Sequence, residues 1–270
     1  MTPPLLPPRS LVGMIHVGAL PGSPSSRRAV REIVAAAAHE ASVLANAGFE
    51  ACIVENMHDR PYVNAPHAAA TIATMTACTH AVRTAAPGLV CGVQVLSFGH
   101  IEALAVALAT ESSFIRVENF VYAHVADEGL LANAAAGDLL RTRKNWGAEN
   151  IRVMCDIKKK HASHALTADL SIADAAHAAE FFGADGLIVT GLFTGSPVSQ
   201  ADLTATRAGS SLPVWVGSGA DASQLPHLFQ HADALIVGSS IKHTGVWDQP
   251  LDPARCVQLV AARDALGSAR

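Results

Sequence analysis

The stretch Gly183-Ala-Asp-Gly-Leu-Ile-Val-Thr190 runs from a helix end, through an acidic residue, into a short apolar run. The same order of features recurs in Gly48-Phe-Glu-Ala-Cys-Ile-Val-Glu55 and in Ala232-Asp-Ala-Leu-Ile-Val-Gly238. A short run that is nearly all apolar predicts a strand of a parallel sheet, because helices cover both faces of such a sheet. The chain is therefore expected to repeat one unit of strand and helix.

Eight apolar runs of this kind occur along the chain, at residues 11–16, 51–55, 90–96, 114–117, 151–156, 186–190, 214–217 and 234–238. Alanine-rich stretches of helical period separate them. After Asp169, for example, Ile172, Ala176 and Ala179 recur on one face, and Gly183 follows as a stop signal. Eight strands that alternate with helices predict an α/β fold of the closed (β/α)₈ or TIM-barrel type. An open doubly wound sheet is the alternative.

The length of 270 residues suits one barrel, since single barrels commonly have about 250 residues. No linker or change of composition marks a boundary, so residues 1–270 are expected to form a single domain. Residues 1–10 contain four prolines and are expected to be an irregular N-terminal segment. A long loop or lid is expected at 118–134, because this stretch precedes the next helix without a helical pattern.

Charge and composition exclude several classes of partner. The chain has 19 Lys and Arg against 23 Asp and Glu, so we expect neither nucleic acid nor an anionic membrane surface as a partner. No apolar run reaches the roughly 18 residues needed for membrane insertion. The five cysteines form no C-x-x-C pair, which is typical of core residues in a reducing, cytoplasmic protein. Alanine-rich helices and only 16% charged residues favour a homo-oligomer.

Two glycine-serine turns predict a phosphate site. They follow the seventh and eighth expected strands, which are neighbours in a barrel, and glycines there let backbone N–H groups approach an anion. The phosphate-binding candidates are Gly217, Ser218, Gly219, Gly238, Ser239 and Ser240. Lys242 is a candidate for additional charge. The alternative for either turn alone is a tight strand end without a ligand.

Polar side chains at the other strand ends predict an active face. Charged groups at buried strand ends are costly unless they are paired or used, and barrel enzymes place their chemistry at this face. The substrate-binding candidates are His16, Asn56, Gln94, Glu118 and Thr190. The alternative is that these side chains tie loops together by hydrogen bonds.

The acid/base candidates are Glu55, Asp156, Lys158 and His161. Asp156 and Lys158 would share one face if their strand continues, so that the carboxylate orients the ammonium. His161 is a candidate proton shuttle near neutral pH, and Lys158 is alternatively a Schiff-base nucleophile. The alternative is a solvated basic loop, which three consecutive lysines favour for Lys159 and Lys160 more than for Lys158.

These patterns specify no cofactor, and a divalent metal is the one candidate. His16, Glu55, Asp156 and His161 are ligand types that suit a divalent metal, but their spacing matches no compact metal motif. The chain also lacks the glycine-rich loops of nucleotide-binding proteins and the serine-hydrolase elbow.

Several segments together resemble the BtpA family, also called BtpA/SgcQ. They are Gly13-Met-Ile-His-Val-Gly-Ala-Leu-Pro-Gly-Ser-Pro24, Val54-Glu-Asn-Met-His-Asp-Arg-Pro61, Phe114-Ile-Arg-Val117, Asp156-Ile-Lys-Lys-Lys-His161, Val189-Thr-Gly191 with Thr194-Gly195, and Val237-Gly-Ser-Ser-Ile-Lys242. The resemblance extends over essentially the whole chain. It implies a TIM barrel of the ribulose-phosphate-binding type, and the family takes its name from a role in photosystem I accumulation in cyanobacteria.

Two departures from the family pattern fall on the expected active face. They are Gln94-Val-Leu-Ser-Phe-Gly99, and Val117-Glu-Asn-Phe-Val-Tyr-Ala-His124 followed by Asp127-Glu-Gly129. The substrate is therefore expected to differ from that of cyanobacterial members, and a photosystem role is not transferred.

The leading hypothesis is an enzyme that acts on a small phosphorylated metabolite, either a sugar phosphate or a nucleotide-derived ester, by lyase, isomerase or glycosyl-type chemistry. One alternative is a non-catalytic assembly or regulatory factor of the photosystem I biogenesis type. A second alternative is a sensor of a phosphorylated metabolite.

Overall fold

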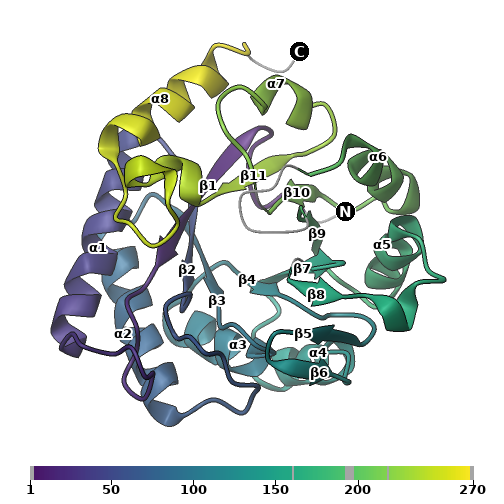
Figure 1. The fold of residues 1–270 in the computed structure, drawn as a ribbon, viewed down its shortest axis with the longest axis horizontal. Helices are drawn as coiled ribbons and strands as arrows, with labels where there is room; N and C mark the ends of the chain where they lie inside the picture. Colours follow the sequence, from purple (N-terminus) through teal and green to yellow (C-terminus); the bar gives the residue numbers. More distant parts are fainter. Residues whose placement is uncertain (1–2, 160, 192–197, 218, 268–270) are drawn as a thin grey trace.

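The computed structural model describes residues 3–159, 161–191, 198–217 and 219–267. Eight parallel strands close a barrel in the order β1-β11-β10-β9-β7-β4-β3-β2 (Figure 1). The strands are β1 (Ser10–His16), β2 (Ala51–Glu55), β3 (Val90–Gln94), β4 (Phe114–Val117), β7 (Arg152–Ile157), β9 (Gly186–Val189), β10 (Val214–Val216) and β11 (Ala234–Val237). Because β1 pairs with both β2 and β11, the expected (β/α)₈ barrel is confirmed and the open sheet is wrong.

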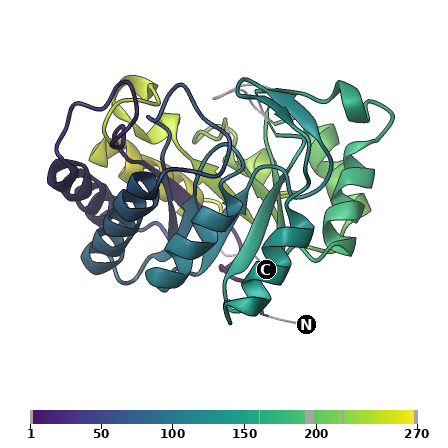
Figure 2. The same cartoon turned by 90° about the horizontal axis from the view of Figure 1, so that it is seen from below.

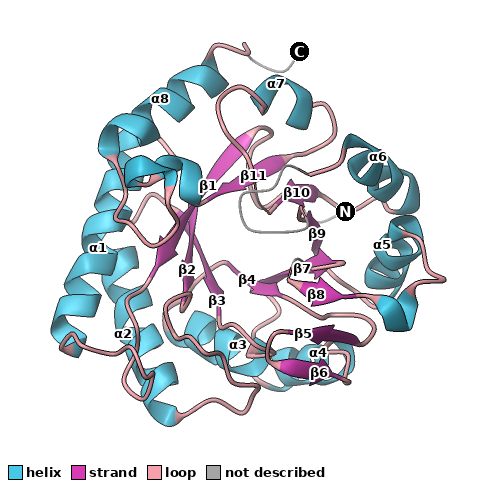
Figure 3. Ribbon diagram, in the orientation of Figure 1, coloured by secondary structure: helices cyan, strands magenta, loops and turns pink. Residues whose placement is uncertain are grey.

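Helices surround the barrel on the outside (Figure 3). They are α1 (Val30–Ala47), α2 (Ala69–Ala85), α3 (His100–Ala109), α4 (Ala136–Asn145), α5 (Ile172–Phe181), α6 (Gln200–Gly209), α7 (Leu225–Leu228) and α8 (Pro253–Asp264). Local sequence fixes several ends. Ser171 caps α5 by accepting a hydrogen bond from the backbone N–H of Asp174, and Asp252 caps α8 in the same way. Gly48 ends α1 with φ of 95°, a conformation that favours glycine.

Side chains of the strands alternate between the barrel interior and the helix layer. The inner apolar cluster includes Val12, Met14, Ile53, Phe114, Met154, Ile188, Trp215 and Ile236. The residues between them pack with the helices in a second, larger cluster. Continued toward the carboxyl ends, the alternation places His16, Glu55, Gln94, Arg116 and Asp156 on the inside.

A small antiparallel sheet lies at one end of the barrel (Figure 2). Its order is β6-β5-β8, from β5 (His124–Ala126), β6 (Gly129–Leu131) and β8 (Ala162–Ser163). The stretch expected as a long loop at 118–134 therefore contains a hairpin, and β8 from the loop after β7 pairs with it.

All five cysteines are buried and none forms a disulfide. Within the described ranges, no helix combines the length and the apolar character that a membrane span requires.

Candidate active site

A cavity of about 530 Å³ opens at the carboxyl ends of the barrel strands. Eleven of the residues singled out in the sequence line it, namely His16, Glu55, Gln94, Glu118, Asp156, His161, Gly217, Gly219, Gly238, Ser239 and Ser240. These residues come from β1, β2, β3 and β7, from the segments that follow β4 and β7, and from the turns after β10 and β11. The structure thus brings the expected polar ring and the glycine-serine turns to one cavity.

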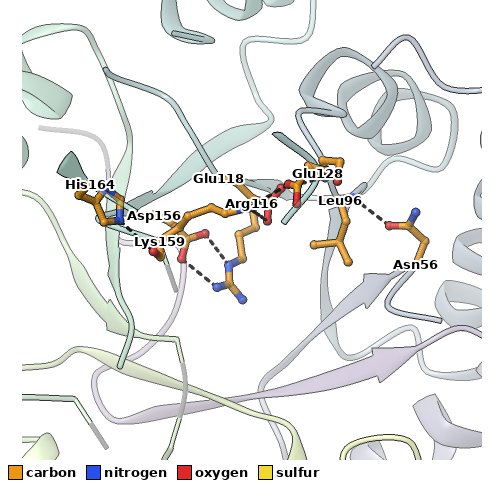
Figure 4. Close-up of polar contacts among 9 residues, drawn as sticks. Asn56, Leu96, Arg116, Glu118, Glu128, Asp156, Lys159 and His164 are labelled. Carbon is orange, nitrogen blue, oxygen red and sulfur yellow. Dashed lines mark hydrogen bonds and ion pairs between the residues drawn. The ribbon is translucent and has the colours of Figure 1, made fainter. Parts of the chain in front are cut away.

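Asn56 does not line this cavity. It follows Glu55 on β2 and therefore points to the other side of the strand. Its Oδ1 accepts a hydrogen bond from the backbone N–H of Leu96 at 2.8 Å (Figure 4). Its Nδ2 donates to Asp59 at 3.2 Å. The expectation of Asn56 as a substrate ligand is corrected: this side chain ties two loops together.

The expected pairing of Asp156 with Lys158 does not occur, because β7 ends at Ile157 and Lys158 has φ of 52°. The turn directs Lys158 out of the cavity, where its Nζ donates to the carbonyl of Leu170 at 2.8 Å. The next lysine, Lys159, lines the cavity instead. The interpretation of Lys158 as an active-face ammonium or nucleophile is therefore wrong in geometry, and so is that of Lys159 as solvated.

Arg116 of β4 and Asp156 of β7 form a buried, two-pronged ion pair (Figure 4). The Arg116 Nε donates to Asp156 Oδ2 at 2.9 Å, and Nη2 donates to Oδ1 at 2.8 Å. Burial alone would lower the pKa of Arg116, but the attraction of Asp156 outweighs it and raises that pKa. The guanidinium is therefore a permanent charge at the floor of the cavity.

Lys159 lies between two carboxylates (Figure 4). Its Nζ donates to Glu118 and to Glu128, both at 3.2 Å, and its side chain is 9% exposed. Burial would lower the pKa of Lys159, but the two carboxylates raise it above the ordinary lysine value. Glu118 also accepts a hydrogen bond from the backbone N–H of Ser97 at 2.9 Å. Lys159 thus joins the ends of β4 and β7 to the hairpin turn.

His16 and Glu55 end the neighbouring strands β1 and β2 and contact each other. His16 Nε2 lies 3.3 Å from Glu55 Oε2, and His16 Nδ1 lies 3.2 Å from the carbonyl oxygen of Trp247. A carbonyl can only accept, so Nδ1 carries a hydrogen and Nε2 faces the carboxylate. Trp247 itself packs against His58 at 5.0 Å between ring centroids, with Arg60 stacked over it at 4.6 Å.

The glycine-serine turns differ in what each residue supplies. The Gly217 N–H donates to Val189 at 2.8 Å, so Gly217 provides clearance and not a donor. A Cβ there would lie 2.6 Å from Ile188 and 2.7 Å from Thr190. Ser239 and Ser240 begin a 3₁₀ turn, whose first N–H groups have no partner within the turn.

The arrangement differs from the expected one at Ser240, Thr190 and Lys242. The Ser240 hydroxyl donates to the carbonyl of Ala220 at 2.7 Å, which links the two turns. Thr190 is buried beside Gly217 but does not line the cavity, and Ser218 lies outside the described residues. Lys242 is 1% exposed, its Nζ lies 3.9 Å from Glu40, and it does not line the cavity.

The metal hypothesis finds no ligand set in the described part of the chain, where no three His, Cys, Asp or Glu side chains converge as ligands. Asp156 is engaged by Arg116, and Glu55 contacts His16. Two uncharged polar atoms at the cavity wall are unpartnered among the described residues, Gln94 Oε1 and Ser97 Oγ. A polar ligand would satisfy both atoms.

Sequence reasoning missed Arg116, Lys159, Glu128 and Trp247 as cavity residues. Arg116 carried a signal, because a charge inside an apolar strand is costly unless it has a partner. Trp247 carried none, because its place depends on how the loop after β11 folds back over His16.

The fold and this cavity define a class: a (β/α)₈ barrel with a polar site at the carboxyl ends of its strands. The sequence model of the BtpA family matches residues 8–265, and the chain belongs to this family. An uncharacterized mitochondrial protein of Caenorhabditis elegans, F13E9.13, is 42% identical over 90% of this chain and 88% of its own length. The photosystem I biogenesis protein BtpA of Synechocystis is 32% identical over 93% of this chain and 87% of its own length.

Solved structures confirm the fold. Thiamine phosphate pyrophosphorylase from Pyrococcus furiosus aligns with a TM-score of 0.59 at 13% identity, over 96% of each chain. A 3-hexulose-6-phosphate synthase aligns with a TM-score of 0.57 at 16% identity, over 94% of this chain and 99% of the other. Such distant identities establish the architecture alone.

Proposed function

We propose that this protein is an enzyme that acts on a small phosphorylated metabolite by acid/base chemistry at the carboxyl ends of its barrel strands. The observation that carries the proposal is the single cavity that holds both the glycine-serine turns and the His16–Glu55 pair. The names of the two barrel enzymes above, each of which includes a phosphate, support a phosphate ester as the ligand.

In this proposal the phosphate lies on the turns after β10 and β11. Gly219, Gly238, Ser239 and Ser240 line the cavity there, and the first N–H groups of the 3₁₀ turn point positive charge toward an anion. Gly238 has room for a ligand, because a Cβ there would meet nothing closer than 3.6 Å.

The His16–Glu55 pair is proposed to move the proton. Because Nδ1 of His16 donates to Trp247, Nε2 is the nitrogen that faces the carboxylate and is available for proton transfer. His161 lines the same cavity and is the second acid/base candidate. Asp156 is proposed to orient Arg116, since both of its oxygens accept from that guanidinium. Lys159 stays protonated, which disfavours a Schiff base.

The phosphate site is tested by thermal unfolding with ribose 5-phosphate and with ribose. We expect ribose 5-phosphate alone to raise Tm, by the equivalent of about 2.7 kcal/mol at a hundredfold excess over Kd. Gly238→Asp places a negative charge in the turn and should abolish the shift. Gly88→Asp is the matched control, because a Cβ at Gly88 meets nothing within 4 Å and the residue is not in the cavity. Equal stabilisation of both variants would contradict the phosphate site.

The acid/base role is tested by NMR in D₂O. An enzyme that removes a carbon-bound proton should exchange deuterium into the bound sugar phosphate. Glu55→Gln keeps the size of the side chain and should stop this exchange while ligand binding persists. Exchange at the wild-type rate in Glu55→Gln would contradict the role of the His16–Glu55 pair.

A second candidate is an assembly factor, which the name of the Synechocystis relative favours. Its partner would bind outside the cavity, so partner capture would survive Glu55→Gln and Gly238→Asp. A sensor, in contrast, would bind the phosphate ester without any deuterium exchange. We also propose a homo-oligomer in the cytoplasm, which sedimentation and localisation experiments would test.

A further inference from the structure

One edge of the Arg116 guanidinium, formed by Nη1 and Nη2, has N–H groups without a partner among the described residues, and we call it the unused edge. A guanidinium has five N–H bonds, and Asp156 accepts one from Nε and one from Nη2. The remaining hydrogen of Nη2 and both hydrogens of Nη1 find no acceptor among the described residues. Arg116 is only 6% exposed, so these donors are inside the protein and not on its surface.

The unused edge faces the cavity that Arg116 lines. In Figure 4 the outer edge of the guanidinium points away from the other side chains drawn. Its Nη2 lies 3.2 Å from the position that a Cβ of residue 217 would take. Glycine at 217 therefore keeps open the space between Arg116 and the first glycine-serine turn.

The geometry of this edge suits an anion that offers two neighbouring oxygens. One N–H of Nη1 and one of Nη2 run parallel, which matches the two oxygens of a carboxylate. Asp156 holds the guanidinium in place, so little side-chain entropy is lost when a ligand binds. Arg116 is buried, whereas Gly219, Ser239 and Ser240 on the turns are partly exposed. The edge thus lies deeper than the proposed phosphate position.

We propose that Arg116 binds a carboxylate of the substrate, so that the substrate is a phosphorylated carboxylic acid. This inference rests on the proposed phosphate site and adds a second anionic group to its ligand. Lys159, by comparison, is already engaged by Glu118 and Glu128.

The proposal is tested with two ligands that differ at one group. Glycerol 3-phosphate carries a hydroxymethyl group where 3-phosphoglycerate carries a carboxylate. Calorimetric titration of the wild-type protein should give at least about tenfold tighter binding of 3-phosphoglycerate, as a charge-assisted pair of hydrogen bonds implies. Equal affinities would overturn the carboxylate subsite while leaving the phosphate site intact. Binding of neither ligand would overturn the phosphate site and this inference together.

A double variant tests whether Arg116 causes the preference for 3-phosphoglycerate over glycerol 3-phosphate. Arg116→Gln with Asp156→Asn removes both charges and leaves no unpaired carboxylate. This variant should bind both ligands with the affinity of wild type for glycerol 3-phosphate. Asp185 pairs with Arg143 at 2.7 Å and with Arg152 at 3.3 Å, and none of these residues lines the cavity, so Arg143→Gln with Asp185→Asn should keep the preference. An undiminished preference in the Arg116 double variant would overturn the assignment, and equal weakening of both ligands would assign Arg116 to the phosphate.

Discussion

At the scale of single residues, the cavity is organised by pairs of opposite charge. Arg116 is matched by Asp156, and Lys159 is matched by Glu118 and Glu128. Such pairs gain little net stability over an apolar core, because burying each charge is costly. Each partner is nevertheless required for stability, because removal of one partner leaves the other charge buried and unpaired.

Arg116→Met is therefore expected to destabilise the protein strongly. Loss of the guanidinium leaves Asp156, whose side chain is 2% exposed, without its partner. The free energy of unfolding should fall by about 3–5 kcal/mol. Urea denaturation followed by circular dichroism measures it. Adding Asp156→Leu should recover most of the loss, and failure to recover would show that the pair is not the cause.

His124 is expected to make stability fall in mild acid. Burial, followed by the charges of Lys159 and His164, lowers the pKa of His124 to about 4. The unfolded state, with a histidine pKa near 6.5, then binds more protons, so stability is lost as pH falls from about 6.5 toward 4. Unfolding curves of His124→Gln should lose about 1–2 kcal/mol less than wild type between pH 7 and pH 5. His80→Gln, at an exposed position on α2, is the control, and a wild-type profile in His124→Gln would refute the assignment.

At the scale of elements, the small sheet depends on contacts from two loops. The hairpin of β5 and β6 belongs to the loop after β4, and β8 belongs to the loop after β7. Two-stranded hairpins are marginal alone, so the third strand and the Lys159–Glu128 ion pair stabilise this one. The hairpin turn also brings Glu128 to the cavity wall.

Lys159→Met is expected to loosen this hairpin. The substitution leaves Glu118 and Glu128 as neighbouring unpaired carboxylates, which repel each other. Hydrogen exchange by mass spectrometry should show faster exchange in residues 124–131, by about tenfold, with the barrel strands unchanged. Lys144→Met removes an exposed pair with Glu149 and should change nothing in the hairpin. Unchanged exchange in Lys159→Met would mean that β8 alone holds the hairpin.

The strands of the barrel could be predicted from sequence, because each is a short run of mostly apolar residues. The hairpin could not be predicted, because β5 and β6 have three residues each and show no clear alternation of apolar and polar residues. Among the site residues at strand ends, His16, Glu55 and Asp156 line the cavity as their position predicts, whereas Asn56 and Thr190 do not. Lys158 was misplaced because the strand ends one residue before it, and Lys159 was overlooked for the same reason.

At the scale of the whole molecule, one cavity depends on closure of the entire barrel. The first strand pairs with the last, Ser10 opposite Ala234, so no local segment holds the site by itself. Arg116 on β4 reaches across the barrel to the side of Gly217 after β10. This dependence on pairing between distant segments is typical of slow, cooperative folding.

A chain that ends at Ala232 is expected not to fold cooperatively. It lacks β11 and α8, which leaves β1 and β10 with unpaired edges. Thermal unfolding followed by circular dichroism should show no sigmoidal transition. A chain that ends at Asp264 keeps every strand and helix and should retain one. A cooperative transition in the shorter chain would show that closure is not needed.

Side chains along β4 alternate between the barrel interior and the helix layer. The number of residues in this strand therefore matters as much as their type. Deletion of a single residue ahead of Arg116 would turn the guanidinium outward among the helices and bring Val117 inside. Substitutions in the strands are therefore tolerable where insertions and deletions are not. The loops, including the one that carries the hairpin, have no such alternation of side chains, so a change in their length turns no side chain to the wrong face. Ligand preference is accordingly free to diverge through loop length, while each strand retains its register.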